Sequence, residues 1–137
     1  MLWNALKSKR LRKHYNLFMN DKKQPSNRQL KVGQQIRFLV SNFFIKEDFI
    51  FDNFDSKNLT IVDVMLSPDL KNAKIFVITN PFYENKFFID ELNRKSNLIQ
   101  RKIATSLTLK FTPKIKFFFD NSMDYSNKIN KILETIK

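Results

Sequence analysis

Two apolar, β-branched segments joined by Ser-Pro-Asp occupy residues 59–79 (LTIVDVMLSPDLKNAKIFVIT). Residues 60–67 and 74–79 are rich in Val, Ile and Phe, which suit the pleated, half-buried surface of a strand. Pro68 cannot donate a hydrogen bond to a sheet, and Asp69 can accept from nearby backbone amides, so both favour a turn. The sequence therefore predicts a β-hairpin with a longer loop, on which the other apolar segments must pack.

A helix is predicted before the hairpin. Ser26 and Gln29 are spaced for a capping box, and apolar residues at helical spacing continue to about Phe44. Gly33 lies inside this helix, where it costs about 1 kcal/mol relative to Ala, and the sequence shows no contact that explains it. An acidic, irregular connector is predicted at residues 46–57.

Two helices in tandem, a third strand and a last helix are predicted after the hairpin. Residues 82–94 and 98–107 have helical spacing, with a polar joint at 95–97. Residues 114–120 (KIKFFFD) alternate, which predicts a strand with one core face, and a helix is predicted from about residue 122. A hairpin plus a strand reached through a helical crossover gives an α+β fold, a small mixed sheet with helices on a face.

Positive charge is concentrated in two blocks. The chain has 25 Lys and Arg against 13 Asp and Glu, a formal net charge of +12. Residues 1–25 hold seven Lys/Arg and one Asp, residues 94–116 hold seven Lys/Arg and no acid, and residues 46–93 have a net charge of −4. This distribution predicts an anionic partner, nucleic acid first and a membrane surface second.

Several function classes are excluded by residue types that are absent or scarce. The chain has no Cys, which removes thiolate chemistry and fits a reducing cytosol, and the single Gly33 rules out glycine-rich phosphate loops. With His14 as the one histidine, no catalytic set or metal-ligand spacing is present, so we expect no enzyme activity and no cofactor. No apolar run approaches the ~20 residues of a membrane helix.

Residues 1–25 are predicted to form a basic N-terminal arm that precedes a body at residues 26–137. Three interpretations of the arm stay open: an RNA-contacting or loosely ordered segment, a segment that serves only solubility, or a targeting segment for organellar import. A cytoplasmic location is expected in the first two cases. An amphipathic arm could also bind an anionic membrane surface.

The order and spacing of these motifs resemble the ribosome-binding factor A family. The most specific segment is residues 67–74 (SPDLKNAK), supported by LNR at 92–94, and the resemblance extends over about residues 28–134. The other residues that carry it are Asp63, Val64, Ile99, Arg101, Ile103, Ala104, Leu107, Leu109, Lys110, Pro113, Ile115, Phe117, Asp120, Ser122, Ile129 and Leu133.

This resemblance implies a KH-like domain of type II topology (α-β-β-α-kink-α-β) with a C-terminal helix. It implies a ribosome assembly factor, not an enzyme, that binds 16S rRNA and free 30S subunits or their precursors during late maturation and processing. A monomer with no membrane partner is expected. The family has an Ala-x-Gly kink where this chain has Lys95-Ser96-Asn97, and Asn97 is predicted to adopt a positive φ or to end the helix.

RNA contacts are expected mainly at phosphates and riboses, from basic side chains near the joint, along the following helix and on the first helix. Each candidate side chain alone could belong to a solvated helix face. Seven Lys and Arg residues without an acidic residue across 94–116, however, are more than solvation requires. The alternatives are a generic single-stranded RNA-binding KH-like protein and a peripheral membrane-surface protein. The candidate RNA-binding residues are Arg28, Lys31, Arg94, Lys95, Asn97, Arg101, Lys102, Lys110 and Lys114.

Three features outside this set have structural interpretations. Asp63, a lone carboxylate on a strand, is predicted to pair with a Lys or Arg across the sheet. Asp69, Lys71 and Asn72 in the hairpin loop could be functional, but Ser-Pro-Asp favours the interpretation that they form the turn. Phe118 is expected to pack under the last helix rather than to stack on a base.

Overall fold

The computed structural model describes residues 25–46, 49–52, 54–79 and 86–120. The α+β fold is confirmed there, whereas the last helix and all of the basic arm except Pro25 lie outside these ranges. The described elements are α3 (Asn27–Ile45), a short 3-10 helix η1 (Ser56–Asn58), β1 (Leu59–Leu66), β2 (Asn72–Thr79), α4 (Lys86–Arg94), α5 (Ser96–Ala104) and β3 (Lys114–Phe119).

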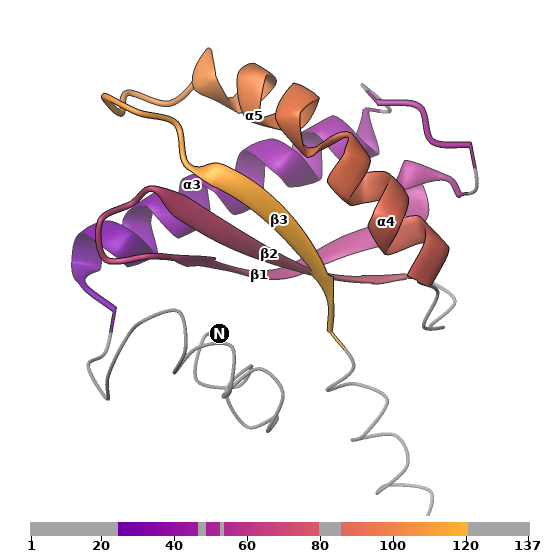
Figure 1. Cartoon of the computed structure of the whole chain (residues 1–137), viewed down its shortest axis with the longest axis horizontal. Coiled ribbons are helices and arrows are strands. Elements are labelled where there is room, and N and C mark those ends of the chain that lie inside the picture. The colour runs from indigo at the N-terminus through magenta and orange to yellow at the C-terminus, as the bar shows by residue number, and fades with distance from the viewer. Residues whose placement is uncertain (1–24, 47–48, 53, 80–85, 121–137) are drawn as a thin grey trace, which may run out of the picture.

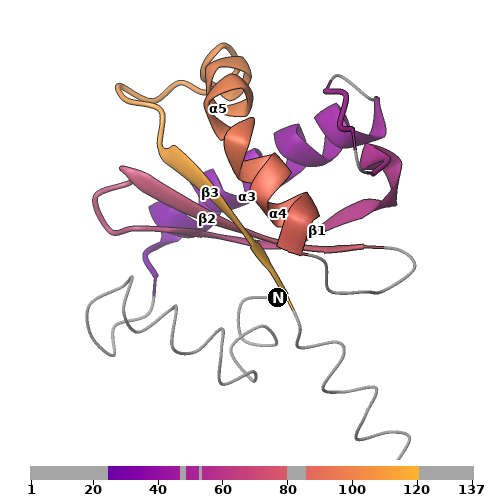
Figure 2. The same cartoon turned by 45° about the vertical axis from the view of Figure 1, so that its right-hand side comes forward.

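The sheet has three strands in the order β1-β2-β3, with β2 in the centre. β1 and β2 form the predicted antiparallel hairpin, and β3 lies parallel to β2 because the α4–α5 crossover returns the chain to the same end. The register of the hairpin shifts between Ile61 and Asp63, which is a β-bulge. The α-helices of the described residues lie together on one face of this sheet (Figure 1, Figure 2).

Capping and a close helix–strand contact position α3. The predicted capping box is confirmed, because Ser26 Oγ accepts from the Gln29 backbone N–H (3.2 Å) and Gln29 Oε1 accepts from the Ser26 N–H (2.8 Å). Gly33 faces β1, and a Cβ at this position would lie 3.0 Å from the carbonyl oxygen of Val64. The missing side chain therefore permits the close approach of α3 to the sheet that the sequence alone could not reveal.

The hydrophobic core fills the space between the helices and the sheet. Ile36 and Phe44 of α3, Ile75 of β2 and Phe117 of β3 are buried there, together with Ile99 of α5. Side chains of α3 and α5 thus pack with those of β2 and β3 in one core, which fixes the position of these helices on the sheet.

The loop between β1 and β2 is held by side-chain hydrogen bonds. Ser67 Oγ donates to Asp69 Oδ1 (2.6 Å), which also accepts from the Lys71 backbone N–H (3.1 Å), and Asn72 N–H donates to Ser67 Oγ (3.0 Å). These bonds lower the pKa of Asp69, chiefly through Ser67. Leu70 has φ 60°, the one positive φ at a non-glycine residue in the described ranges. The contacts support the turn interpretation.

Candidate nucleic-acid interface

α4 and α5 meet in a bend at Lys95. This residue has φ −94° and ψ 3°, between the last residue of α4, Arg94, and the first of α5, Ser96. The Lys95 backbone N–H is shared between the carbonyl oxygens of Glu91 (3.2 Å) and Leu92 (3.1 Å). The predicted interruption is therefore present, and local hydrogen bonds make it without a glycine.

The prediction for Asn97 is wrong. Asn97 is the second residue of α5 and has no positive φ, so it neither ends α4 nor adopts a left-handed conformation. The bend instead uses the bridge region of the backbone at Lys95, which L-residues can adopt. Ser96 assists, because its Oγ donates to the Asn93 carbonyl oxygen (2.8 Å) across the joint.

A side-chain amide fixes the end of α4 to the sheet. Asn93 Oδ1 accepts from the Phe117 backbone N–H (2.8 Å), and Asn93 Nδ2 donates to the Phe117 carbonyl oxygen (3.1 Å). Phe117 pairs on its other side with β2. The bend therefore has a defined position relative to β3, two residues after this anchor.

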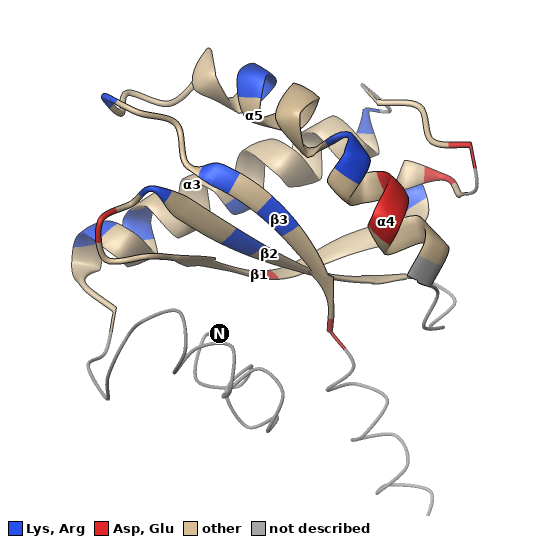
Figure 3. Ribbon diagram, viewed as in Figure 1, with Lys and Arg blue, Asp and Glu red and all other residues tan. Residues whose placement is uncertain are grey.

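Cationic and polar side chains surround the bend, and we call them the joint cluster: Arg94, Lys95, Asn97, Arg101 and Lys102. Arg94, Asn97 and Arg101 are exposed, and the last two lie one helical turn apart on α5. Figure 3 shows the basic positions at the α4–α5 joint and along α5. Since residues 94–116 contain no acid, this surface presents only positive charge from its own segment.

Aromatic rings hold the two lysines of the joint cluster. Lys95 Nζ donates to the Ile50 carbonyl oxygen and lies 5.2 Å from the centroid of the Phe51 ring. Lys102 Nζ lies 4.9 Å from the Phe43 ring centroid, and it also lies over the Phe49 ring. Cation–π attraction of this kind restricts where the ammonium groups point.

The connector between α3 and η1 therefore belongs to the site, because its rings contact lysines of the joint cluster. The sequence alone did not reveal this role. The connector was predicted only as an acidic, irregular segment. A retrospective signal exists in the alternation Phe49-Ile50-Phe51, which places two rings on one side of an extended chain. No sequence pattern indicates that these rings reach lysines on α5.

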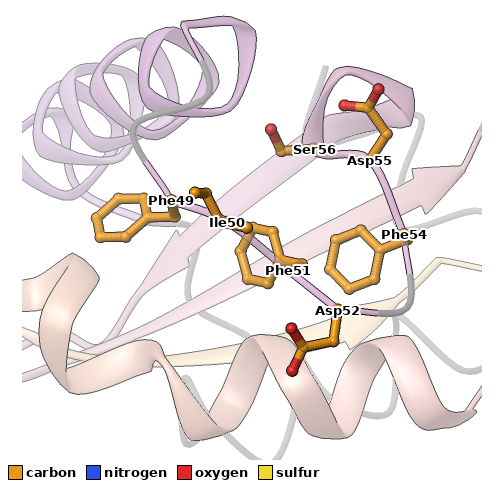
Figure 4. Close-up of a pocket in the computed structure, with 7 residues that line it drawn as sticks. All are labelled: Phe49, Ile50, Phe51, Asp52, Phe54, Asp55 and Ser56. Atoms are coloured by element: carbon orange, nitrogen blue, oxygen red, sulfur yellow. The ribbon is translucent and has the colours of Figure 1, made fainter.

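An open pocket of about 630 Å³ lies at this connector (Figure 4). The Phe51 and Phe54 rings stack in it with centroids 4.5 Å apart, and the Asp52 backbone N–H donates to Oε1 of buried Glu91. Its lining of aromatic and acidic side chains does not suit a phosphate group. The lining residues are Phe49, Ile50, Phe51, Asp52, Phe54, Asp55 and Ser56.

Other basic residues that were predicted to bind RNA lie outside the joint cluster. Arg28 and Lys31 lie on the first turns of α3, whose Gln29 Nε2 donates to the Leu66 carbonyl oxygen (2.9 Å) at the end of β1. The Lys114 N–H donates to the Lys71 carbonyl oxygen (2.8 Å). Figure 3 shows basic positions at the start of α3, around the β1–β2 loop and at the start of β3. We call them the hairpin-end cluster: Arg28, Lys31, Lys71 and Lys114.

Lys110 belongs to neither cluster. It is exposed in the segment between α5 and β3, and its Nζ lies 5.6 Å from the centroid of the exposed Phe111 ring. Lys71, in contrast, was interpreted mainly as part of a turn, although its side chain is exposed and its carbonyl oxygen accepts from Lys114, a predicted RNA-binding residue.

The predicted ion pair of Asp63 is wrong. The residue opposite Asp63 on β2 is Phe76, and the base on that strand, Lys74, lies opposite Met65. Asp63 Oδ1 accepts from the Val64 backbone N–H (2.8 Å), and its Oδ2 is buried with no hydrogen-bond partner in the described part of the chain. Burial raises the pKa of this carboxyl group.

Metal-binding clusters and membrane-spanning helices are both absent from the described residues. No group of three or more His, Asp or Glu side chains in these ranges could hold a metal ion. None of the helices found there has the length and apolar character needed to cross a membrane.

A family model described as Ribosome-binding factor A matches residues 28–133. The chain belongs to the ribosome-binding factor A family. It is 31% identical over 109 residues to ribosome-binding factor A of Pelagibacter ubique, which covers 80% of this chain and 89% of that protein. The resemblance carried by SPDLKNAK is thereby confirmed.

Solved structures of ribosome-binding factor A have the same fold. The crystal structure from Thermus thermophilus matches with a TM-score of 0.57 and 17% identity, over 69% of this chain and 98% of that one. A homology model of the Thermus thermophilus protein, fitted into a cryo-EM map of its complex with 30S, matches with a TM-score of 0.54 and 17% identity, over 68% and 96%. At such identity the likeness concerns the fold alone.

Proposed function

We propose that this member of the ribosome-binding factor A family binds the small (30S) ribosomal subunit and its 16S rRNA during late maturation. In this role the chain acts as a cytoplasmic monomer that promotes assembly by binding and catalyses no reaction. Family membership supports it, as does the 30S complex named for the Thermus thermophilus protein.

The observation that carries the proposal is the joint cluster. Its exposed side chains, Arg94, Asn97 and Arg101, lie beside a bend that Asn93 anchors to β3. Lys and Arg that neutralise phosphates provide most of the affinity for folded RNA, and the shape of the protein decides where it binds. A rigid bend with cations on both sides fits the backbone of a folded RNA better than it fits a single base.

The aromatic contacts make the surface specific in shape. Lys95 and Lys102 are held over rings of α3 and the connector, so their ammonium groups are oriented before RNA binds. Pre-orientation lowers the side-chain entropy that is lost on binding. The hairpin-end cluster offers a second group of phosphate contacts on the same molecule.

A salt titration of binding to purified 30S subunits tests the mechanism. If about five phosphates are neutralised, the logarithm of affinity should fall with the logarithm of salt concentration with a slope near −4. The variant Arg101→Glu should bind more weakly and reduce this slope by about 1. Lys57→Glu, a charge-matched change of an exposed residue on η1, is the control.

Failure of the chain to comigrate with 30S particles in dilute buffer would overturn the proposal. Tight binding to short single-stranded oligonucleotides, at the affinity found for 30S, would favour the generic RNA-binding alternative. An equal loss in both charge variants would show that net charge, rather than the joint cluster, carries binding.

A further inference from the structure

The face of the sheet that points away from the helices has its own composition. No described helix lies over it (Figure 1, Figure 2). One row across the strands consists of Asp63, Phe76 and Phe118, and the next consists of Met65, Lys74 and Lys116. This surface plays no part in the joint cluster, so it needs an explanation of its own.

Burial on this face is uneven. Met65 of β1 is 3% exposed and Phe76 of β2 is 1% exposed, although both point away from the helical layer. At the β3 edge, Phe118 is only half-buried and Lys116 is exposed. Large apolar side chains at the centre of an uncovered sheet keep access to water. The burial therefore indicates an occupant over β1 and β2 rather than over β3.

Negative charge accompanies the apolar centre. Asp63 has a buried Oδ2 without a hydrogen-bond partner in the described ranges, which is costly for a carboxylate. Desolvation raises its pKa most, and the Asp120 carboxylate adds to this, whereas the Val64 N–H and Arg37 oppose it. An occupant that brings apolar side chains and a cation would cover the apolar centre and place a positive charge beside Asp63.

Residues 1–24 have this composition and directly precede α3. They contain seven Lys/Arg and one Asp, and apolar residues such as Trp3, Leu6 and Leu11 are interspersed with the Lys and Arg residues. The start of α3 is tied to Leu66 at the end of β1, and Asp63 lies three residues back along that strand, about 10 Å away. Even a fully helical segment of this length, about 36 Å long, reaches across the strand.

We propose that the helix-free face of β1 and β2 is the docking surface for residues 1–24 of the same chain. Apolar side chains of that segment cover Met65 and Phe76, and its Lys or Arg side chains lie beside Asp63 and Asp120. The competing segment, residues 121–137, carries a net charge of only +1 and continues from β3, the edge where burial is least. RNA would favour the Lys74–Lys116 side instead.

Trp3 is the single tryptophan of the chain, so its fluorescence reports on this segment without labelling. In the full-length protein, we expect Trp3 emission to be blue-shifted and protected from acrylamide, relative to the same protein in urea. Asp63→Lys replaces the carboxylate with a cation, which repels a segment that carries seven Lys/Arg. This reversal should shift the equilibrium away from the docked state by about fivefold, the scale of a partly exposed ion pair, and so increase quenching.

A matched control and a second variant keep the test decisive. Asp90→Lys makes the same charge reversal at an exposed position of α4, on the helical side, and should leave Trp3 quenching unchanged. The double variant Arg10→Glu and Arg12→Glu changes no residue of the described body and should increase quenching as Asp63→Lys does. Full accessibility of Trp3 in the native chain would overturn the proposal, as would equal effects of the two Asp variants. Loss of protection only when residues 121–137 are removed would assign the face to that segment.

Discussion

The side-chain amide of Asn93 binds both backbone groups of Phe117, accepting from its N–H at 2.8 Å and donating to its carbonyl oxygen at 3.1 Å. The amide therefore occupies the place of a neighbouring strand at the outer edge of β3. Because Lys95 follows two residues later, this pair of bonds determines where the joint cluster lies relative to the sheet.

Asn93→Asp should destabilise the protein by about 2 kcal/mol at neutral pH. The carboxylate keeps the acceptor but loses the donor, and it places an oxygen against the Phe117 carbonyl oxygen. Urea unfolding measures the change. Asn97→Asp, the same substitution at an exposed position in the first turn of α5, should change stability by less than about 0.5 kcal/mol, since a negative charge there meets the positive end of the helix dipole. Similar losses for both variants would contradict the role given to Asn93.

Alanine substitutions at Lys95 and Arg101 should distinguish effects on the free energy of unfolding from effects on 30S binding. Lys95→Ala removes the contact with the Phe51 ring and the hydrogen bond to Ile50, so it should cost about 0.5–1 kcal/mol of stability as well as affinity for 30S. Arg101 is exposed, and Arg101→Ala should weaken binding while changing the free energy of unfolding by less than about 0.5 kcal/mol. Paired urea and binding titrations check both. An unchanged stability in Lys95→Ala would show that the ring does not hold the ammonium group.

Gly33→Ala should destabilise the protein, against the usual preference of helices for Ala. The gain in helix propensity is about 1 kcal/mol, but a Cβ would lie 3.0 Å from the Val64 carbonyl oxygen, and overpacking of this kind costs about 1–3 kcal/mol. Thermal and urea unfolding should show a net loss. Gln34→Ala, at the exposed neighbouring position of α3, should be close to neutral. A gain in stability for Gly33→Ala would mean that α3 moves off β1 at little cost.

Local patterns predicted the elements of the fold well. The Ser26–Gln29 capping box, the hairpin around Pro68 and the break between two helices each depend on residues close in sequence, and the structure has all three. The parallel placement of β3 followed from the crossover rule. These features need no knowledge of what packs against them.

Features that depend on contacts between distant segments could not be predicted in this way. The Phe51 ring meets Lys95 across 44 residues of sequence, and Gly33 is explained only by Val64 on another element. Asp63 has no cation opposite it on β2 because its cross-strand neighbour is Phe76, a register that the bulge between Ile61 and Asp63 decides. The error at Asn97 arose differently, from assuming that the bend needs a left-handed residue.

The β1–β2 loop should lose stability in acid, and Asp69 is the residue to test. Hydrogen bonds from the Ser67 hydroxyl and the Lys71 N–H lower its pKa in the folded chain below the ordinary 3.8. A lowered carboxyl pKa means that its contribution to stability is complete above 3.8 and is lost as pH falls through the folded value. The stability advantage of the wild type over Asp69→Asn should therefore be constant near neutral pH and shrink in acid below that point.

Ser67→Ala removes the main cause of the lowered pKa of Asp69 and leaves the hydrogen bond from the Lys71 N–H in place. The free energy of unfolding of this variant should therefore fall less in acid than that of the wild type. Urea unfolding of the three proteins at several pH values measures it. A difference between wild type and Asp69→Asn that stays the same down to the most acidic buffer would mean that the ionised carboxylate is not what holds Ser67 and Lys71 in the turn. In that case Leu70, with its φ of 60°, would have to be held in the left-handed region by packing alone.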